Sequence, residues 1–340
     1  MIAILSYRGW SEVRQGEISM QVKWRNNLKN GCRHAVLAPI LLLSGCAGNP
    51  FWIFDPKGLM ADTNLFYLLV DVGIMGSIVG LTALLVIWFM WRYQKGKNRG
   101  KYDPTWSHSN TIEVVVWGIP IIAVGFLSYF AVTGTFELNP YNPTVITNHL
   151  KPVSDPVEVD VIATDWQWLF VYPQYHMAAA NELVLPAHTP VFFRLTSSAV
   201  TTTFFIPQLV GMIDVMPGMR TKNALESNHV GEYQGIASDY AGAGTSWMTF
   251  KTRIVKSADF REWVRKVQQS PTSMTYASFN DYADPYINVH HKVAYFSSVP
   301  DGLFDHVVDE VMKGKTWPIP PMMTENMVAY MQKQNAEHRD

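Results

Sequence analysis

Two long runs of apolar residues interrupt a chain that otherwise mixes polar and apolar positions. Residues 72–91, VGIMGSIVGLTALLVIWFMW, and residues 114–133, VVVWGIPIIAVGFLSYFAVT, each hold 20 residues without a charge. At about 1.5 Å per residue, a helix of that length covers the roughly 30 Å hydrocarbon core of a bilayer. Trp91 ends the first run and Trp117 lies near the start of the second, as interface anchors often do. The pattern predicts two transmembrane helices, with a kink at Pro120 in the second.

The segment between these runs, residues 92–113, is rich in cations: Arg92, Lys95, Lys97, Arg99 and Lys101. Residues 46–71, which precede the first run, contain a single cationic side chain, that of Lys57. Because lysine and arginine collect in cytoplasmic loops, this asymmetry places residues 92–113 in the cytoplasm. We therefore expect a helical hairpin in a bacterial inner membrane, with both termini of the mature chain in the periplasm.

The N-terminal residues 1–45 have the pattern of an export signal. A basic stretch precedes a short apolar run over residues 35–43, which is too short to span a bilayer. The run ends in LSGC, residues 43–46, which resembles the site where bacterial lipoproteins are cleaved and acylated. This predicts a lipid on Cys46. The alternative is a free cysteine after an ordinary cleavage site, and translation could start at Met1 or at Met20.

A different pattern begins at residue 156. Short stretches that alternate polar and apolar positions, rich in β-branched and aromatic residues, follow one another to residue 254. Turn residues separate them, which predicts an exported Greek-key β-sandwich after a linker over residues 134–155. Residues 255–314 show helical periodicity, and residues 315–340 predict a flexible tail. The fold class is a membrane-anchored α+β protein.

Composition narrows the possible functions. The formal net charge is −1, so a nucleic-acid partner is not expected. The only two cysteines are Cys32 and Cys46, so the body of the protein has neither a disulfide framework nor a cysteine-ligated metal site.

One glycine-rich stretch, GIASDYAGAGTSWM at residues 235–248, joins two predicted strands. Loops in this position at the end of a β-domain often hold a metal or a ligand. This loop contains no cysteine and no histidine. The loop is therefore either a binding site for a metal or ligand, or a loop that has the spacing of such a site without its ligand residues.

Four motifs give the chain a family resemblance. They are WSHSNTIEVVVWGIPI, DWQWLFVYP, FFIPQL and DVMPGMR, in this order along the chain. Together they resemble subunit II of the haem–copper respiratory oxidases over about residues 51–304. The resemblance implies that the β-domain is a cupredoxin domain.

In the branch of that family that oxidises cytochrome c, this domain holds a two-copper centre. Its ligands are two cysteines, two histidines, one methionine and a glutamate backbone carbonyl. The same spacing in this chain falls on Ala237, Asp239, Ala241, Thr245 and Met248, and the first histidine falls on Thr202. Only Met248 keeps a ligand side chain, so we expect these to be vestigial copper-loop positions with no metal on this chain.

The copper-free branch is the quinol oxidases of the cytochrome bo type, which the LSGC and FDPKG motifs also resemble. That branch implies a proton-translocating quinol oxidase in which this subunit carries no catalytic residue and no cofactor, while subunit I holds the haems and one copper. The implied partners are subunit I, small membrane subunits, membrane lipid and ubiquinol. The alternatives are a copper-bearing cytochrome c oxidase subunit and a non-redox lipoprotein scaffold.

Three further residues carry predictions. The resemblance places Glu113 at the entrance of a proton-uptake path into subunit I, whereas a helix cap formed with Asn110 is the structural alternative. Trp166 and Trp168 are two apart, so we expect them to share one face of a strand and to pack against subunit I or in the core. The hydroxyls of Thr201 to Thr203 are expected to satisfy backbone groups or to fill space.

Overall fold

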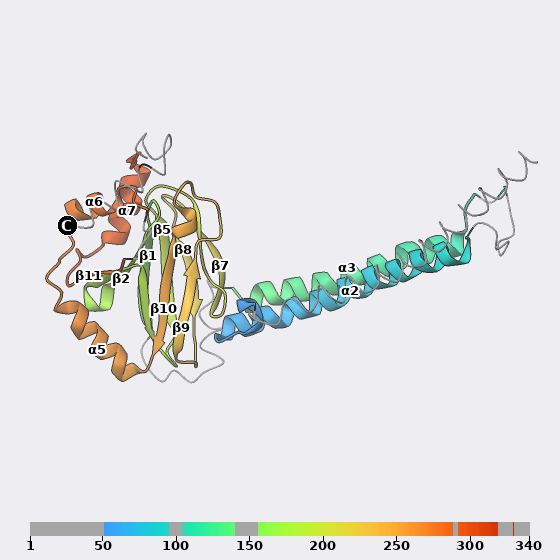
Figure 1. The fold of residues 1–340 in the computed structure, drawn as a ribbon, viewed down its shortest axis with the longest axis horizontal. Helices are drawn as coiled ribbons and strands as arrows, with labels where there is room; N and C mark the ends of the chain where they lie inside the picture. Colours follow the sequence, from blue (N-terminus) through green and yellow to red (C-terminus); the bar gives the residue numbers. More distant parts are fainter. Residues whose placement is uncertain are drawn as a thin grey trace, which may run out of the picture. The chain divides into compact units, whose positions relative to one another are not determined.

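The computed structural model of the chain describes residues 51–94, 104–105, 107–139, 156–287, 292–318 and 329 (Figure 1). The predicted signal peptide, Cys46 and most of the cationic loop lie outside these residues, as do residues 140–155 and most of the predicted tail. From Trp52 onward, the chain forms one compact unit.

The two apolar runs lie within two long helices. Helix α2 spans Leu59–Arg92 and α3 spans Asn110–Glu137, so both extend beyond the uncharged stretches and α3 takes in the first residues of the predicted linker. Both are long and apolar enough to cross a membrane. Most of their large apolar side chains are exposed, which suits a surface that faces lipid or other membrane helices.

The hairpin is held together near the end of α3. There the hydroxyl of Tyr67 donates to Oε2 of Glu137 at 2.7 Å. Gly134 is buried against the ring of Tyr67, where a Cβ atom would lie 3.2 Å from the ring carbons. The small residue therefore permits the close approach of the two helices at this level.

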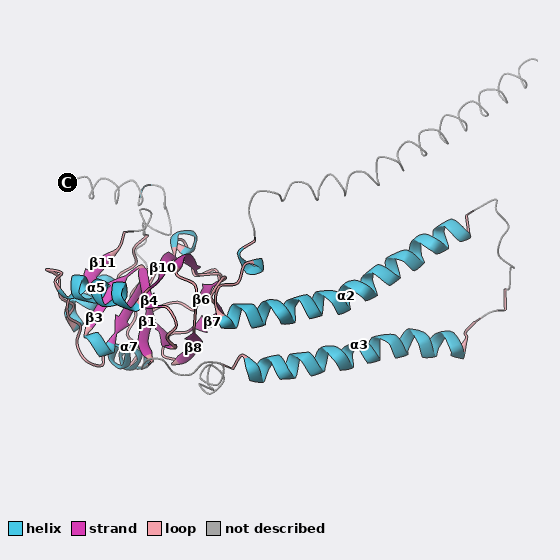
Figure 2. Cartoon of the chain, turned by 90° about the horizontal axis from the view of Figure 1, so that it is seen from below, coloured by secondary structure: helices cyan, strands magenta, loops and turns pink. Residues whose placement is uncertain are grey.

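Residues 156–255, joined by one short strand from residues 294–296, form two β-sheets that pack face to face (Figure 2). The larger sheet, in spatial order, consists of β11 (Ala294–Phe296), β3 (Met177–Ala180), β2 (Trp168–Tyr172), β1 (Val157–Ala163), β5 (Val191–Ser197) and β8 (Thr221–Leu225). The smaller sheet consists of β4 (Glu182–Pro186), β10 (Thr249–Val255), β9 (Gly231–Ile236), β6 (Thr202–Ile206) and β7 (Val210–Val215). Pairs such as β1 with β2 and β9 with β10 are antiparallel, whereas β1 with β5 and β4 with β10 are parallel. This is the predicted sandwich.

Aromatic side chains fill the space between the sheets. Trp168 and Phe170 come from β2, while Phe204 and Phe250 come from the other sheet. Their ring centroids lie between 5.1 and 6.5 Å apart, within the range of favourable aromatic pairs. Helix α5 (Ser257–Gln268) adds Phe260 and Trp263 to the same core.

The C-terminal segment covers the outer face of the larger sheet. Helices α6 (Tyr276–Ala283) and α7 (Leu303–Met312) bury a second apolar cluster against β1, β2 and β3. The sequence predicts only helices here, but residues 294–296 form β11, an edge strand that pairs with β3. A three-residue strand has no readable period, so its partner alone defines it.

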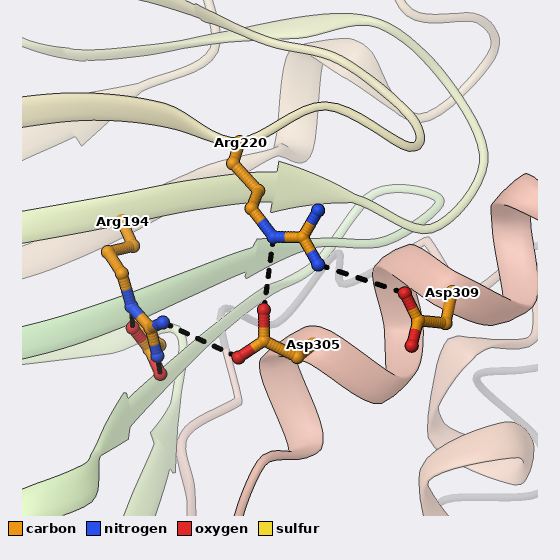
Figure 3. A network of polar contacts seen from close by, with 5 residues as sticks. Arg194, Arg220, Asp305 and Asp309 are labelled. Carbon is orange, nitrogen blue, oxygen red and sulfur yellow. Dashed lines mark hydrogen bonds and ion pairs between the residues drawn. The ribbon is translucent and has the colours of Figure 1, made fainter.

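Two arginines hold α7 on the sheet (Figure 3). Arg194 on β5 makes a two-pronged contact with Asp160 on β1, with both nitrogen–oxygen distances 2.6 Å, and lies 3.5 Å from Asp305 on α7. Arg220 approaches Asp305 at 3.0 Å and Asp309 at 3.7 Å. The paired geometry of Arg194 and Asp160 is the stronger contact, and the exposed pairs mainly set the position of the helix.

The foot of α2 is joined to the sandwich by backbone contacts. The N–H groups of Lys57 and Gly58 both donate to the carbonyl of Gln208, at 2.7 and 3.1 Å. Gly58 also bridges to Ser227, and a Cβ atom on Gly58 would collide with the carbonyl of Leu209. Only glycine fits this approach of two backbones.

Candidate functional site

The candidate site is the loop of residues 237–248, between β9 and β10. Its base is closed by the N–H of Ala237, which donates to the carbonyl of Met248 at 3.1 Å. Beyond that bond the two strands pair antiparallel, with Ile236 opposite Thr249. A short 3-10 helix, Thr245–Trp247, forms the returning arm of the loop.

The six vestigial copper positions lie at different depths. Thr202, Ala241 and Met248 are buried, Ala237 and Thr245 are half-buried, and Asp239 is exposed. The structure brings Thr202 and Met248 together, with the hydroxyl oxygen 3.9 Å from the sulfur. Met248 is therefore a core side chain.

Trp166 forms the floor of the loop. Its ring nitrogen donates to the carbonyl of Ala241 at 2.8 Å, and the side chain is fully buried. The loop passes over the ring at two glycines: a Cβ atom on Gly242 would lie 3.1 Å from the indole, and one on Gly244 would collide with it. The absence of side chains at Gly242 and Gly244 therefore leaves the space that the indole of Trp166 occupies.

The local backbone around Trp166 differs from the prediction. Trp166 does not share a strand face with Trp168, because residues 164–167 form the tight turn between β1 and β2. The N–H of Thr164 donates to the carbonyl of Gln167 at 3.0 Å, and Trp166 has a φ of 106°, in a region that side chains rarely adopt. That strained turn is what points the indole under the loop.

Trp168 also supports the loop from inside the sandwich. Its ring nitrogen donates to the carbonyl of Met248 at 3.4 Å, and its ring packs between the two sheets. Both tryptophans are 0% exposed. Both side chains therefore pack in the core of this chain, as the second of the two expectations has it, and neither reaches the surface of this chain, where subunit I would be met.

Hydroxyl groups hold the exposed arm of the loop. Oγ1 of Thr203 accepts from the N–H groups of Ser238 and Asp239, at 2.8 and 3.1 Å. Oγ1 of Thr245 accepts from the N–H of Ala241 and donates to the carbonyl of Gly242, both at 2.8 Å. The prediction that hydroxyls satisfy backbone groups is confirmed for Thr203, whereas Thr202 faces sulfur.

These residues do not fit a two-copper centre. Copper electron-transfer sites use thiolate and imidazole ligands, whereas the loop offers methyl, hydroxyl, phenol and indole groups, one carboxylate and a single thioether. In the described part of the chain, no group of three or more histidine, cysteine, aspartate or glutamate side chains is placed to hold a metal ion. Of the histidines, His176 pairs with Asp301 at 2.9 Å, and the ring of His306 lies tilted against that of Tyr276, with the centroids 4.3 Å apart.

Asp165, next to Trp166, is a buried carboxylate that the sequence analysis missed. Its side chain is 1% exposed, and Oδ1 is buried without a hydrogen-bond partner. Burial raises the pKa of Asp165 from its usual 3.8 to about 6. Its only sequence signal is its place in DWQW, which carries no mark of burial.

Glu113 lies in the first turn of α3 and is exposed. The cap of this helix is Ser109 rather than Asn110, and no side chain makes a capping hydrogen bond. The backbone N–H of Glu113 donates to the carbonyl of Ser109 at 3.0 Å. The box of Asn110 and Glu113 is therefore absent, and helix capping does not account for this carboxylate beyond its favourable place near the helix N-terminus.

A cavity of about 310 Å³ lies away from the loop, at the foot of α2. Its lining includes Lys57, Asp62, Glu226 and His229. Glu226 is buried with Oε2 unpaired; burial raises its pKa, and the nearby His188 opposes that rise. The cavity mixes both signs of charge and lies by the junction of hairpin and sandwich.

Two family models match the region that follows the helical hairpin. Residues 172–255 match the family model described as Cytochrome C oxidase subunit II, periplasmic domain. Residues 268–315 match the COX Aromatic Rich Motif, which corresponds to the segment that covers the larger sheet. The sequence analysis predicted helices there without identifying a separate motif.

Whole-chain relatives extend the match. The chain is 40% identical over 271 residues to the cytochrome bo(3) ubiquinol oxidase subunit 2 of Pseudomonas putida, covering 80% of this chain and 83% of that protein. It is 38% identical over 276 residues to the protein of the same name from Buchnera aphidicola, covering 81% and 93%. A solved periplasmic domain of cytochrome oxidase subunit II from Bradyrhizobium japonicum matches with 21% identity and a TM-score of 0.32, covering 34% of this chain and 96% of that one.

We predict that Thr203→Val loosens the loop more than Thr202→Val does. Valine keeps the volume of threonine, but at position 203 it leaves the N–H groups of Ser238 and Asp239 without their acceptor, a loss of about 1–2 kcal/mol. At position 202 only a weak contact to sulfur is lost. Hydrogen exchange of the peptide covering residues 237–248, with chemical unfolding of the full chain, measures the difference. Equal exchange in both variants would contradict the role of Thr203.

Asp165→Asn should raise stability at pH 8 and leave it nearly unchanged at pH 4. Because the folded-state pKa lies above the usual value, the wild-type protein loses stability as the pH rises from about 4 to about 6. We expect a gain of about 2 kcal/mol in the variant at pH 8, after a discount for partial hydration. Unfolding curves at a series of pH values test this, with Asp239→Asn on the exposed loop as the control. A wild-type profile without a fall between pH 4 and 6 would refute it.

Proposed function

We propose that this chain, which belongs to the ubiquinol oxidase subunit 2 family of the haem–copper oxidases, is the second subunit of a terminal quinol oxidase. Such a complex oxidises quinol in the membrane and reduces oxygen to water. The observation that carries the proposal is the loop of residues 237–248, which keeps the outline of a copper loop but offers no thiolate or imidazole.

Within this proposal the chain holds no redox centre. Electrons from quinol enter the complex from within the membrane, so a relay at the outer surface is not needed. The space beside the loop is occupied by the indole of Trp166 and by the side chains of Met248 and Thr202. The loop then serves to close the end of the sandwich.

Subunit I is the proposed main partner, and it holds the haems and one copper of the complex. Support comes from the hairpin, whose apolar side chains are exposed along both α2 and α3. A Cβ atom added to Gly73, Gly76 or Gly80 would meet nothing of this chain within 4 Å, which suits close packing of another helix on α2. Further small membrane subunits, lipid and ubiquinol complete the proposed set of partners.

The proposed location is the bacterial inner membrane, with the sandwich in the periplasm. Arg92 in the last turn of α2 begins the cationic segment, which supports a cytoplasmic position for the loop between the helices. The proposed acyl group on Cys46 would add a third attachment to the membrane.

Glu113 is the proposed proton-entry residue of this chain. It follows the cytoplasmic loop, lies at the start of α3 and is exposed on the surface that a partner helix could contact. A carboxylate at the edge of the membrane can collect protons from the cytoplasm and pass them into subunit I.

The first test is to purify the complex through a tag on this chain and measure oxygen uptake. We expect haem in the preparation and uptake with a quinol, but none with reduced cytochrome c. Uptake with cytochrome c would contradict the absence of a redox centre. A preparation without haem and without uptake on either donor would support the lipoprotein scaffold instead.

For Glu113→Gln we expect a several-fold slower quinol-driven oxygen uptake, equivalent to about 1 kcal/mol of barrier. The physical reason is the loss of a group that exchanges protons at the entrance, so Glu113→Asp should recover part of the rate. Asn110→Ala, one turn earlier on the same helix, is the control. An unchanged rate with normal haem content would show that protons enter elsewhere.

A further inference from the structure

Four consecutive large apolar residues, Phe51 to Phe54, stand exposed just before the first long helix. Trp52, Ile53 and Phe54 form a short 3-10 helix, here called the aromatic turn, and are 47%, 45% and 54% exposed. Elsewhere in the described exported region, exposed apolar side chains such as Met212, Val230 and Met312 are scattered along the sequence. Scattered residues of this kind are normal on a protein surface, whereas a contiguous group marks a contact.

The backbone that follows the aromatic turn prevents it from folding into the core. The side chain of Gln208 donates to the carbonyl of Asp55 at 3.2 Å, and its own backbone carbonyl accepts from Lys57 and Gly58. Asp55 is paired with Lys57 at 2.7 Å. The turn is therefore fixed at the foot of α2, with about half of each of its apolar side chains exposed.

The position along the chain points to the bilayer surface as the contact. Helix α2 begins at Leu59 and contacts the turn, and its exposed apolar face starts at Phe66, about 10 Å further along the axis. The headgroup layer adds roughly 5–8 Å to each side of the hydrocarbon core, which brings it close to the foot of the helix. On the other side, Cys46 precedes Trp52 by six residues, a reach of at most about 20 Å.

The side-chain types agree with that position. Tryptophan and other amphipathic aromatic residues collect at membrane–water interfaces, where a flat apolar ring and a polar N–H are both accommodated. A partner protein would more often be met by a groove or a broad patch, and three residues in one turn make neither. The turn has the size and chemistry of an interfacial anchor.

We propose that the aromatic turn inserts into the outer leaflet at the boundary of headgroups and acyl chains, and so fixes the depth of the foot of α2. This role rests on the proposed periplasmic position of the sandwich, but it does not depend on acylation of Cys46. The anchor and the acyl group would act as two neighbouring attachments on the same side of the membrane.

The test uses a nitroxide label on Ile53→Cys in the full chain, reconstituted in nanodiscs of phosphatidylcholine and phosphatidylglycerol. Because the sequence has no cysteine after Cys46, one new thiol can be compared with an unmodified background. Val230→Cys serves as a water-exposed reference and Leu84→Cys as a reference within the hydrocarbon, since both wild-type side chains are well exposed. Collisions with oxygen report lipid, and collisions with a water-soluble nickel chelate report water.

The quantity compared is the ratio of nickel collisions to oxygen collisions. We expect this ratio at position 53 to be several-fold lower than at position 230 and higher than at position 84. Adding Trp52→Gln and Phe54→Gln should return it to the value at 230, whereas adding Met212→Gln should not. Nickel access equal to that at 230 would overturn the proposal, and so would shielding from both reagents, which indicates cover by protein. Quinol-driven oxygen uptake by the unlabelled complex tests the proposed function separately. Nitroxide labelling of the chain without an introduced cysteine would reveal a free thiol at Cys46.

Discussion

A backbone N–H or carbonyl group that is shut away from water must find a partner inside the protein. The loop between β9 and β10 satisfies this constraint with side chains of its own chain. Thr203 and Thr245 supply hydroxyl acceptors, and Trp166 and Trp168 supply ring N–H donors. These side chains therefore hold the loop in a defined shape with hydrogen bonds from within the chain.

In this arrangement the loop keeps the residue spacing of a copper loop but lacks its thiolate and imidazole ligands. The glycines at 242 and 244 let the backbone pass directly over the indole of Trp166, and the strained turn at residues 164–167 places that indole. Such strain persists only when the surrounding structure determines it. The side chain of Asp165, buried with its Oδ1 unpaired, lies in the same turn, so two unfavourable features are concentrated beside the loop.

The sequence was most informative where one physical signal dominates. Uncharged runs of 20 residues predict membrane helices, and the ligand spacing located Thr202 and Met248, which do meet in space. The turn at Trp166 was misread as strand because DWQW alternates polar and apolar residues as a strand does. The edge strand β11 and the packing of α7 could not be read, because their partners, Ala178 to Ala180 and Arg194, are more than a hundred residues away.

A loop held by hydroxyls and indoles also has a simpler maturation than one held by thiolates. Paired thiols in an oxidising compartment tend to form a disulfide, and they must be reduced before they can bind copper. The present loop has no thiol to protect. Its closing hydrogen bonds form when the chain folds, so no step of thiol reduction is needed to complete the loop.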